Sequence, residues 1–235
     1  VDGKYARVTA HTSGRLTKSV SVPGTGISQV SSSGGGSGRS SARSVSRTSK
    51  APVAVTARKT KGPGLFAPKW EKELFKALAT DDVSSLVRIG TTYPEARHIC
   101  MTLDGFMYRG LDKDSRARAV FEEVWDSGFD PEQDSFMTTY VVSALTSIEV
   151  APGISAELPL GRDAVGLALA ELRQEAGDLA GAAEIVESLE PSALAAVSLA
   201  ELYAQQGRWQ DVVDLTNGLE GNDDFTIFLL CQRGI

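Results

Sequence analysis

The 235-residue sequence is poor in the residues that disulfide-stapled domains and metal sites need. It has two cysteines, Cys100 and Cys231, which are too few for a disulfide framework. Both lie in apolar stretches with helical spacing, so we expect reduced, buried thiols. His98 and Cys100 form the only close pair of metal-type ligands, but residues two apart on a helix point in nearly perpendicular directions. Because a tetrahedral site needs three or four ligands, the sequence predicts no metal site.

Long apolar runs are also missing. No stretch of about 18 apolar residues exists, which argues against a membrane-spanning helix. The first twenty residues lack the apolar segment of a secretory signal. We therefore expect a cytoplasmic protein.

Motifs for catalysis or cofactor binding are weak. His11 has no acid or nucleophile near it in sequence. The glycines at 24–26 and 34–38 are not followed by Gly-Lys-Ser/Thr and open no helix after a buried strand, so they indicate turn and linker. Glu122-Glu123 and Asp223-Asp224 are typical of a solvated face and a helix start. The sequence therefore predicts no catalytic residue, no cofactor and no enzymatic activity.

Charge divides the chain into two unequal parts. Residues 1–64 hold eleven Lys and Arg against a single acid, Asp2, whereas the remaining 13 basic residues face 29 acidic ones. The net charge of −6 is thus the sum of a +10 arm and a −16 body. An arm of this sign can steer toward nucleic acid, anionic lipid or the acidic body itself.

The first thirty residues predict a small β-structure. Polar and apolar residues alternate over 5–10 and 16–22, on either side of a turn at Ser13-Gly14, which is a hairpin pattern. The string from Ser13 to Ser28, which ends in P-G-T-G-I-S, resembles the closing part of the bacterial domain-of-unknown-function family numbered 4236. The family has no known activity, so the resemblance implies a β-hairpin remnant over 1–30 and no chemistry.

Residues 31–64 form a basic linker by composition. Ser and Gly dominate its first part, and Ser alternates with Arg up to Lys50. With so few large apolar groups the segment cannot repay its ordering entropy, which predicts disorder.

From residue 65 the apolar spacing becomes helical. Trp70, Leu74 and Leu78 recur on one face, and Asp81 is placed to cap a helix over 83–89. Further helices follow up to 148, which we interpret as N-terminal helical hairpins, or degenerate repeats.

The last helix of this region is expected to open at Phe129-Asp130-Pro131 and to run through Leu145. Pro152-Gly153 and Pro159 then predict an irregular connection over 149–162.

Residues 163–221 contain the same pattern twice. At a spacing of thirty residues, Glu171-Leu172 corresponds to Glu201-Leu202, Gly177 to Gly207, and Leu189-Glu190 to Leu219-Glu220. Each copy predicts a helix, a Gly-centred turn and a second helix. Such units must stack on neighbours to bury their apolar faces, so we assign 163–235 to helical repeats with the last one truncated.

The second copy carries the more detailed signature, namely Leu199, Ala200, Tyr203, Gly207 and Trp209. A Leu, a small residue, an aromatic, a Gly and a second aromatic in this order resemble the tetratricopeptide repeat, and Ala182 supplies the small residue of the second helix in the first copy. The spacing is shorter than the family's usual length of about 34 residues, and Arg173 replaces the first aromatic of the first copy.

The resemblance implies a mostly α fold, an α-solenoid of tetratricopeptide-like hairpins preceded by the β-hairpin remnant and the linker. It also implies that the first helices line a concave face that binds a peptide or a partner helix. Gly166, Arg173, Ala196 and Tyr203 are the positions expected on that face. A non-catalytic interaction scaffold with a protein or peptide partner is the leading hypothesis.

The alternative hypothesis is a tether, in which the basic arm over 39–61 binds nucleic acid or a membrane. Whether Ser44, Ser46, Thr48 or Ser49 is phosphorylated, or the arm is a plain spacer, stays open.

The apolar helix over 225–231 predicts a further repeat whose second helix is missing. We expect the full protein to continue past Ile235 with a Gly turn near position 237, one period after Gly207. The chain as given is expected to self-associate through this edge, because two or three exposed apolar side chains forgo several kcal/mol of burial.

Overall fold

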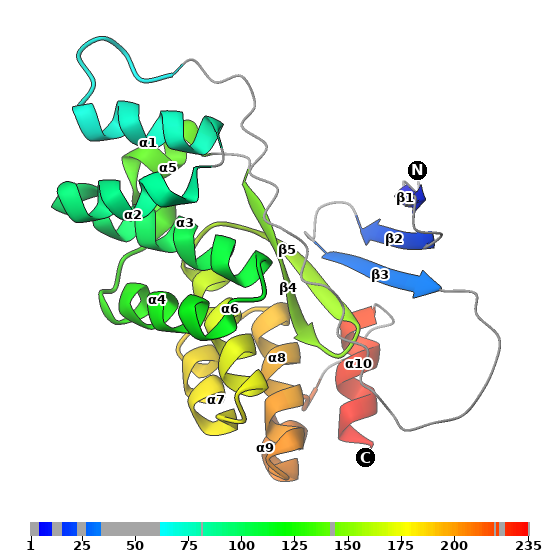
Figure 1. Cartoon of the computed structure of the whole chain (residues 1–235). Helices are drawn as coiled ribbons and strands as arrows, with labels where there is room; N and C mark the ends of the chain where they lie inside the picture. The colour runs from blue at the N-terminus through cyan, green and yellow to red at the C-terminus, as the bar shows by residue number, and fades with distance from the viewer. Residues whose placement is uncertain are drawn as a thin grey trace, which may run out of the picture.

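The computed structural model describes residues 5–10, 16–22, 27–33, 62–80, 82–141, 144–218, 220 and 224–234. The fold is mostly helical, as the apolar spacing predicts, and the helices stand beside a smaller antiparallel β-structure (Figure 1). Of the predicted linker over 31–64, residues 34–61 lie outside the described residues, and they include the whole basic arm over 39–61.

Four helices follow the linker. They are α1 (Lys69–Ala79), α2 (Val83–Thr92), α3 (Arg97–Gly110) and α4 (Asp114–Asp126), with the 3-10 turn η1 (Pro94–Ala96) before α3. Asp82 caps α2, because its carboxylate accepts a hydrogen bond from the Ser85 N–H at 3.2 Å. The cap was predicted one residue earlier, at Asp81, which lies outside the described residues.

The predicted helix from Phe129 through Leu145 is wrong. A 3-10 turn η2 (Pro131–Gln133) and a short helix α5 (Ser135–Tyr140) take its place. Asp134 separates them because its backbone is extended and its carboxylate accepts hydrogen bonds from the N–H groups of Phe136 and Met137. The missed signal is a side-chain cap inside the apolar pattern, which starts a new helix.

The predicted irregular connection over 149–162 is also wrong. Strands β4 (Leu145–Ala151) and β5 (Ile154–Pro159) form an antiparallel hairpin there. Pro152 and Gly153 make its two-residue turn, in which Gly153 has a φ of +78°. Thr146, Ile148 and Val150 alternate with more exposed residues and are buried, so the hairpin belongs to the core.

The remaining strands are β1 (Tyr5–Ala10), β2 (Leu16–Val22) and β3 (Ile27–Ser33). They pair antiparallel in this order, and β3 meets β5 through the pairs Ile27↔Ala156 and Ser28↔Ser155. The strand order among the described residues is therefore β1-β2-β3-β5-β4. The third strand extends to Ser33, past the boundary of 30 predicted for the N-terminal remnant.

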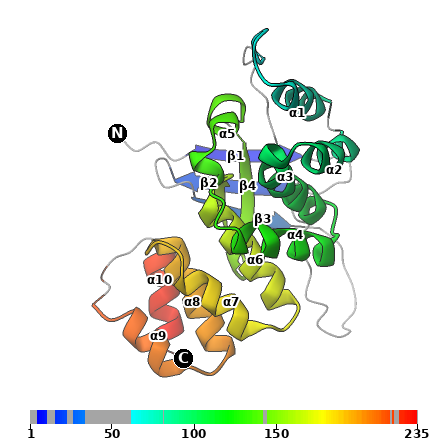
Figure 2. The ribbon, with the colours of Figure 1, turned by 90° about the vertical axis from the view of Figure 1, so that its left-hand side faces the viewer.

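The C-terminal helices are α6 (Arg162–Glu175), α7 (Leu179–Glu187), α8 (Ala193–Gln205), α9 (Trp209–Leu215) and α10 (Asp224–Arg233). Figures 1 and 2 show α7, α8, α9 and α10 gathered at one end of the molecule, with α1 and α2 at the other. Between these ends lies α6, whose seven consecutive residues 164–170 are all buried. A helix buried on every side is a central element, and α6 contacts α4, α7 and β4.

Candidate functional site

The two predicted helix turns have matching geometry. In α6–α7 the Asp178 N–H donates to the Arg173 carbonyl at 2.9 Å, and in α8–α9 the Arg208 N–H donates to the Tyr203 carbonyl at 2.9 Å. Gly177 and Gly207 precede these donors with φ values of +84° and +71°. This is the Schellman motif, in which a left-handed Gly lets the last carbonyls of a helix find donors.

Side chains at corresponding positions of the two hairpins contact each other, by an ion pair in one hairpin and by a cation–π contact in the other. Arg173 lies 3.9 Å from a carboxylate oxygen of Asp178, whereas thirty residues on the Arg208 guanidinium lies 4.1 Å from the Tyr203 ring centroid. Tyr203 also donates a hydrogen bond to Glu187 of α7 at 2.8 Å. Burial, followed by this bond, raises the pKa of Tyr203 to about 12, so its hydroxyl stays a donor.

The positions predicted for a partner-binding face lie within the packing of the helices. Gly166 is buried, and a Cβ at this position would be 2.8 Å from both Trp125 of α4 and Leu189. Arg173 also pairs with Glu122 of α4 at 3.3 Å. Tyr203 is 9% exposed, and Ala196 is half-buried against the core. Gly166, Arg173 and Tyr203 thus hold neighbouring elements together.

The chain's own hairpin covers the first helices of the two predicted units. Strand β4 contacts both α6 and α8. Its outer edge is also engaged, because the buried Arg109 of α3 donates to the Ser147 carbonyl at 2.8 Å. The same guanidinium pairs with Glu171 of α6, with Nε 2.8 Å from Oε2. One arginine therefore ties α3, α6 and β4 together and leaves less of the β4 edge open to a partner strand.

The end of the helical stack formed by α9 and α10 exposes apolar side chains. Trp209, the first residue of α9, is 46% exposed, and so is Ile227 of α10. Cys231 of α10 is exposed, so the prediction of two buried thiols is correct for Cys100 and wrong for Cys231. Helix α10 packs against α8 and α9, while its Ile227 and Cys231 stay exposed.

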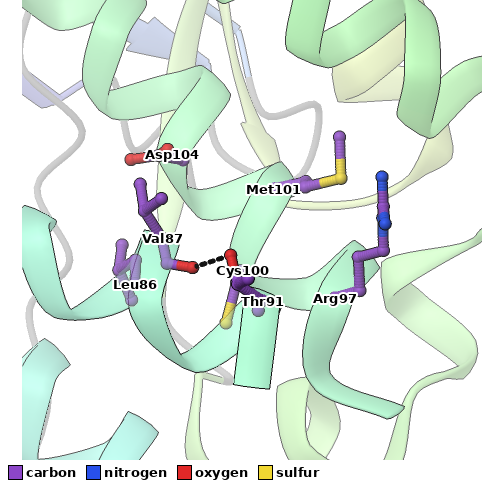
Figure 3. Close-up of a pocket in the computed structure, with 8 residues that line it drawn as sticks. Leu86, Val87, Thr91, Arg97, Cys100, Met101 and Asp104 are labelled. Carbon is purple, nitrogen blue, oxygen red and sulfur yellow. Dashed lines mark hydrogen bonds between the residues drawn. The ribbon is translucent and has the colours of Figure 1, made fainter. Parts of the chain in front are cut away.

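A pocket of about 220 Å3 lies between α2 and α3. Leu86, Val87 and Thr91 of α2 and Cys100, Met101 and Asp104 of α3 line it (Figure 3). The helices approach closely at its base, where a Cβ on Gly90 would be 3.0 Å from the Cys100 Cβ. Arg97 at its rim is engaged by Glu123 of α4, with Nε 3.2 Å from Oε1.

Two ionisable side chains in this pocket have raised pKa values. Burial, followed by the nearby Asp104 charge, raises the pKa of Cys100 to about 12. The thiol therefore stays protonated at neutral pH and is a poor nucleophile. Burial also raises the pKa of Asp104, a shift that a hydrogen bond with Tyr108 partly opposes. Asp104 is 6% exposed, and its Oδ1 has no hydrogen-bond partner among the residues that the structure describes.

Asp104→Asn is expected to raise the thermal midpoint at neutral pH by about 2–4 °C, the change that about 1 kcal/mol produces in a domain of this size. The physical reason is that the folded chain holds the Asp104 proton more tightly than the unfolded chain does. The stability that this proton contributes is complete below the unfolded pKa and is lost as the pH rises through the folded pKa. Thermal unfolding of both proteins at neutral and acidic pH measures this effect. The advantage of the variant should shrink at acidic pH, and a constant advantage would contradict the assignment.

Within the described part of the chain, no group of three or more His, Cys, Asp and Glu is arranged to hold a metal ion. None of the helices in this part is both long and apolar enough to cross a membrane. Comparison with known proteins finds no matching family model, curated protein or solved structure. The resemblances to the tetratricopeptide repeat and to the family numbered 4236 therefore stay predictions.

Proposed function

We propose that this chain is a non-catalytic protein–protein interaction module that binds a helical segment of a partner beside α8 and α9. The observation that carries the proposal is Trp209, whose large side chain is 46% exposed at the start of α9. Tryptophan is enriched among the residues that dominate binding energy, since it buries a large area with little loss of side-chain freedom.

The equivalent position of the first hairpin indicates the kind of partner. Leu179 begins α7 as Trp209 begins α9, and it is half-buried against the core. The end of α8 reaches this position, where the Gln206 side-chain amide donates to the Leu179 carbonyl at 2.8 Å. Thirty residues on, α10 takes the place of α8 and contacts α9, yet Trp209 stays 46% exposed, so a partner helix would cover the part of Trp209 that α10 leaves open. We therefore infer an amphipathic helix, with apolar residues spaced three and four apart.

The position of β4 favours a binding site beside α8 and α9 rather than one on the concave face that the tetratricopeptide resemblance implies. That face belongs to the first helices, α6 and α8, and both contact β4. A peptide bound there would have to displace buried residues such as Ile148, which is 0% exposed. The buried charged groups Arg109 and Glu171 also join elements of the fold, which fits a binding module better than a catalytic site.

Trp209→Ala is expected to weaken a helical ligand by about thirtyfold or more, the loss that marks an interface hot spot. The probe is a phage-displayed library of helix-forming peptides selected against the purified chain. Fluorescence anisotropy of the selected peptides gives their dissociation constants. Peptide binding to the parent protein should also shift the Trp209 emission to the blue, because the indole leaves water.

Leu111→Ala is the matched control, since Leu111 is 56% exposed and stands at the end of α3. It should leave the affinity of the selected peptides unchanged. Peptides that bind the Trp209 variant as tightly as they bind the parent protein would contradict the proposal.

The tether hypothesis concerns the arm over 39–61, which lies outside the described residues, so it stays a prediction of the sequence. Self-association through α10 stays a prediction as well.

A further inference from the structure

The turn before α1 holds two large apolar side chains in solvent. Leu65 is 84% exposed and Phe66 is 98% exposed. They are the middle residues of a β-turn, which is closed by a hydrogen bond from the Ala67 N–H to the Gly64 carbonyl at 3.1 Å. Single apolar residues on a surface are common, but two adjacent ones that the fold leaves this open are available to bind another apolar surface.

Contacts with α1 fix the backbone of this turn. The Lys72 ammonium of α1 donates to the Leu65 carbonyl at 2.6 Å. Before the turn, Gly62 lies against the Phe75 ring, where an added Cβ would be 2.9 Å from Cε1. After the turn, Pro68 is the residue at which α1 begins. Because the backbone is held on both sides, little conformational freedom is left to lose when the two apolar side chains bind.

The face of α1 beside the turn is basic. Lys69, Lys72 and Lys76 are all exposed. Their spacing of three and four residues places them on one face of the helix. The buried residues of the same helix, Leu74 and Ala77, form its opposite side. The turn and the helix therefore offer apolar groups and positive charge side by side.

The acids of α1 do not cancel this charge. Glu73 is already engaged in the fold, since it lies 3.2 Å from Arg88 of α2 and 3.7 Å from Lys69. Glu71 is two residues from Lys69, so it points away from the lysine face. The sequence before the turn adds only cations, because no Asp or Glu occurs between Asp2 and Glu71. The surface around the turn is therefore complementary to a negatively charged partner.

We propose that the turn over 64–67 and the lysine face of α1 form a membrane-docking site, in which Leu65 and Phe66 insert into an anionic bilayer. The lysines beside them would contact the lipid headgroups. Reversible membrane binding combines buried apolar area with attraction to anionic lipids, and both are present here. Nucleic acid would use the charge alone and leave the apolar pair in water. A protruding turn also enters lipid without a matching concave surface, which a protein partner would have to supply.

The docking site lies at the opposite end of the molecule from Trp209. Figures 1 and 2 show the segment before α1 protruding at one end, whereas α9 stands at the other. The site is therefore independent of the proposed function, and either proposal can fail without the other. Together they describe a chain that holds a helical partner at a membrane surface.

Sedimentation of the chain with lipid vesicles tests the proposal. We expect the parent protein to bind vesicles made of equal parts of phosphatidylcholine and phosphatidylserine and to stay in solution with phosphatidylcholine alone. Leu65→Ser/Phe66→Ser should lower the partition coefficient by about tenfold or more, because apolar area no longer enters the lipid. Leu111→Ser is the control, since Leu111 is 56% exposed at the end of α3 and should leave partition unchanged.

The contribution of charge is measured with a second pair of variants. Lys69→Gln/Lys76→Gln should lower the partition coefficient by about fivefold for each lysine, and it keeps Lys72, which holds the turn. Lys113→Gln/Arg116→Gln removes two exposed cations at the start of α4 and should have a smaller effect. Added salt should release the parent protein, because it screens the headgroup charge.

Phe66→Trp measures insertion itself. Brominated phosphatidylcholine in the mixed vesicles should quench the added indole, beyond any quenching of the three tryptophans of the parent protein. The proposal is overturned if the parent protein does not bind the mixed vesicles, if the added indole is not quenched, or if Leu65→Ser/Phe66→Ser binds as the parent does. A duplex oligonucleotide that binds more tightly than the vesicles, and equally to the parent and the serine variant, would overturn it in favour of nucleic acid.

Discussion

Arg109→Met is expected to lower the free energy of unfolding by about 3–5 kcal/mol, the cost of leaving one partner of a buried ion pair without the other. Arg109 is 2% exposed, and the Glu171 side chain is 10% exposed. The substitution removes two contacts at once, the ion pair with α6 and the hydrogen bond to the Ser147 carbonyl of β4. A loss of this size is a large part of the about 5–15 kcal/mol by which domains are stable. Denaturant titration measures it as a lower midpoint with an unchanged slope.

Arg97→Met is the matched control for this experiment, because it is the same substitution on the same helix. Arg97 pairs with Glu123, but their side chains are 56% and 47% exposed. Exposed pairs contribute about 0–1 kcal/mol, so the control should change stability little. The double variant Arg109→Met/Glu171→Leu should recover most of the loss, since it leaves no carboxylate at 171. Equal losses in the Arg109 and Arg97 variants would show that the buried pair does not join these elements.

The helical hairpins could be predicted because their signals are local. Gly177 and Gly207 mark turns that need a left-handed residue, and both turns form where the sequence places them. Residues thirty apart also make corresponding contacts, since Arg173 contacts Asp178 and Tyr203 contacts Arg208, although the chemistry of the two contacts differs. Gly166 and Tyr203, which the resemblance assigns to a binding face, are both buried among neighbouring elements. Burial of a helix face depends on which distant element packs against it, and spacing within the helix cannot identify that element.

The β4–β5 hairpin shows where local signals mislead. Pro152-Gly153 and Pro159 were interpreted as breakers of structure, whereas the first two form the turn and Pro159 ends β5. The alternation of Thr146, Ile148 and Val150 with polar residues was the available signal for a strand. The predicted helix through Leu145 and the predicted irregular connection over 149–162 leave no strand for this alternation. An alternation over seven residues is a weaker signal than the helical spacing of the longer segments on either side of it, so the strand is easily missed in the sequence.

The α2–α3 pocket could be predicted only in part. Ile99, Leu103 and Phe106 recur at helical spacing, and all three are buried in α3. Asp104 lies between them and is buried too, although an aspartate in a helix is usually exposed. An acid within an apolar stripe, four residues after Cys100, was therefore the signal that sequence reasoning missed. Its unpaired oxygen follows from the packing of α2 on α3, which no pattern within one helix reveals.

Ile148→Ala in β4 is expected to lower the free energy of unfolding by about 2–5 kcal/mol, because it removes buried methyl groups and leaves a cavity. Ile148 is 0% exposed on the buried side of a strand that contacts α6 and α8. Leu145→Ala is the control in the same strand, since Leu145 is 44% exposed and such sites usually change stability by about 0.5 kcal/mol or less. Denaturant titration gives both values, and hydrogen exchange should show β4 amides that open only with the helices. If residues 145–159 were a loose connection, the two substitutions would cost the same, and the β4 amides would exchange freely in the parent protein.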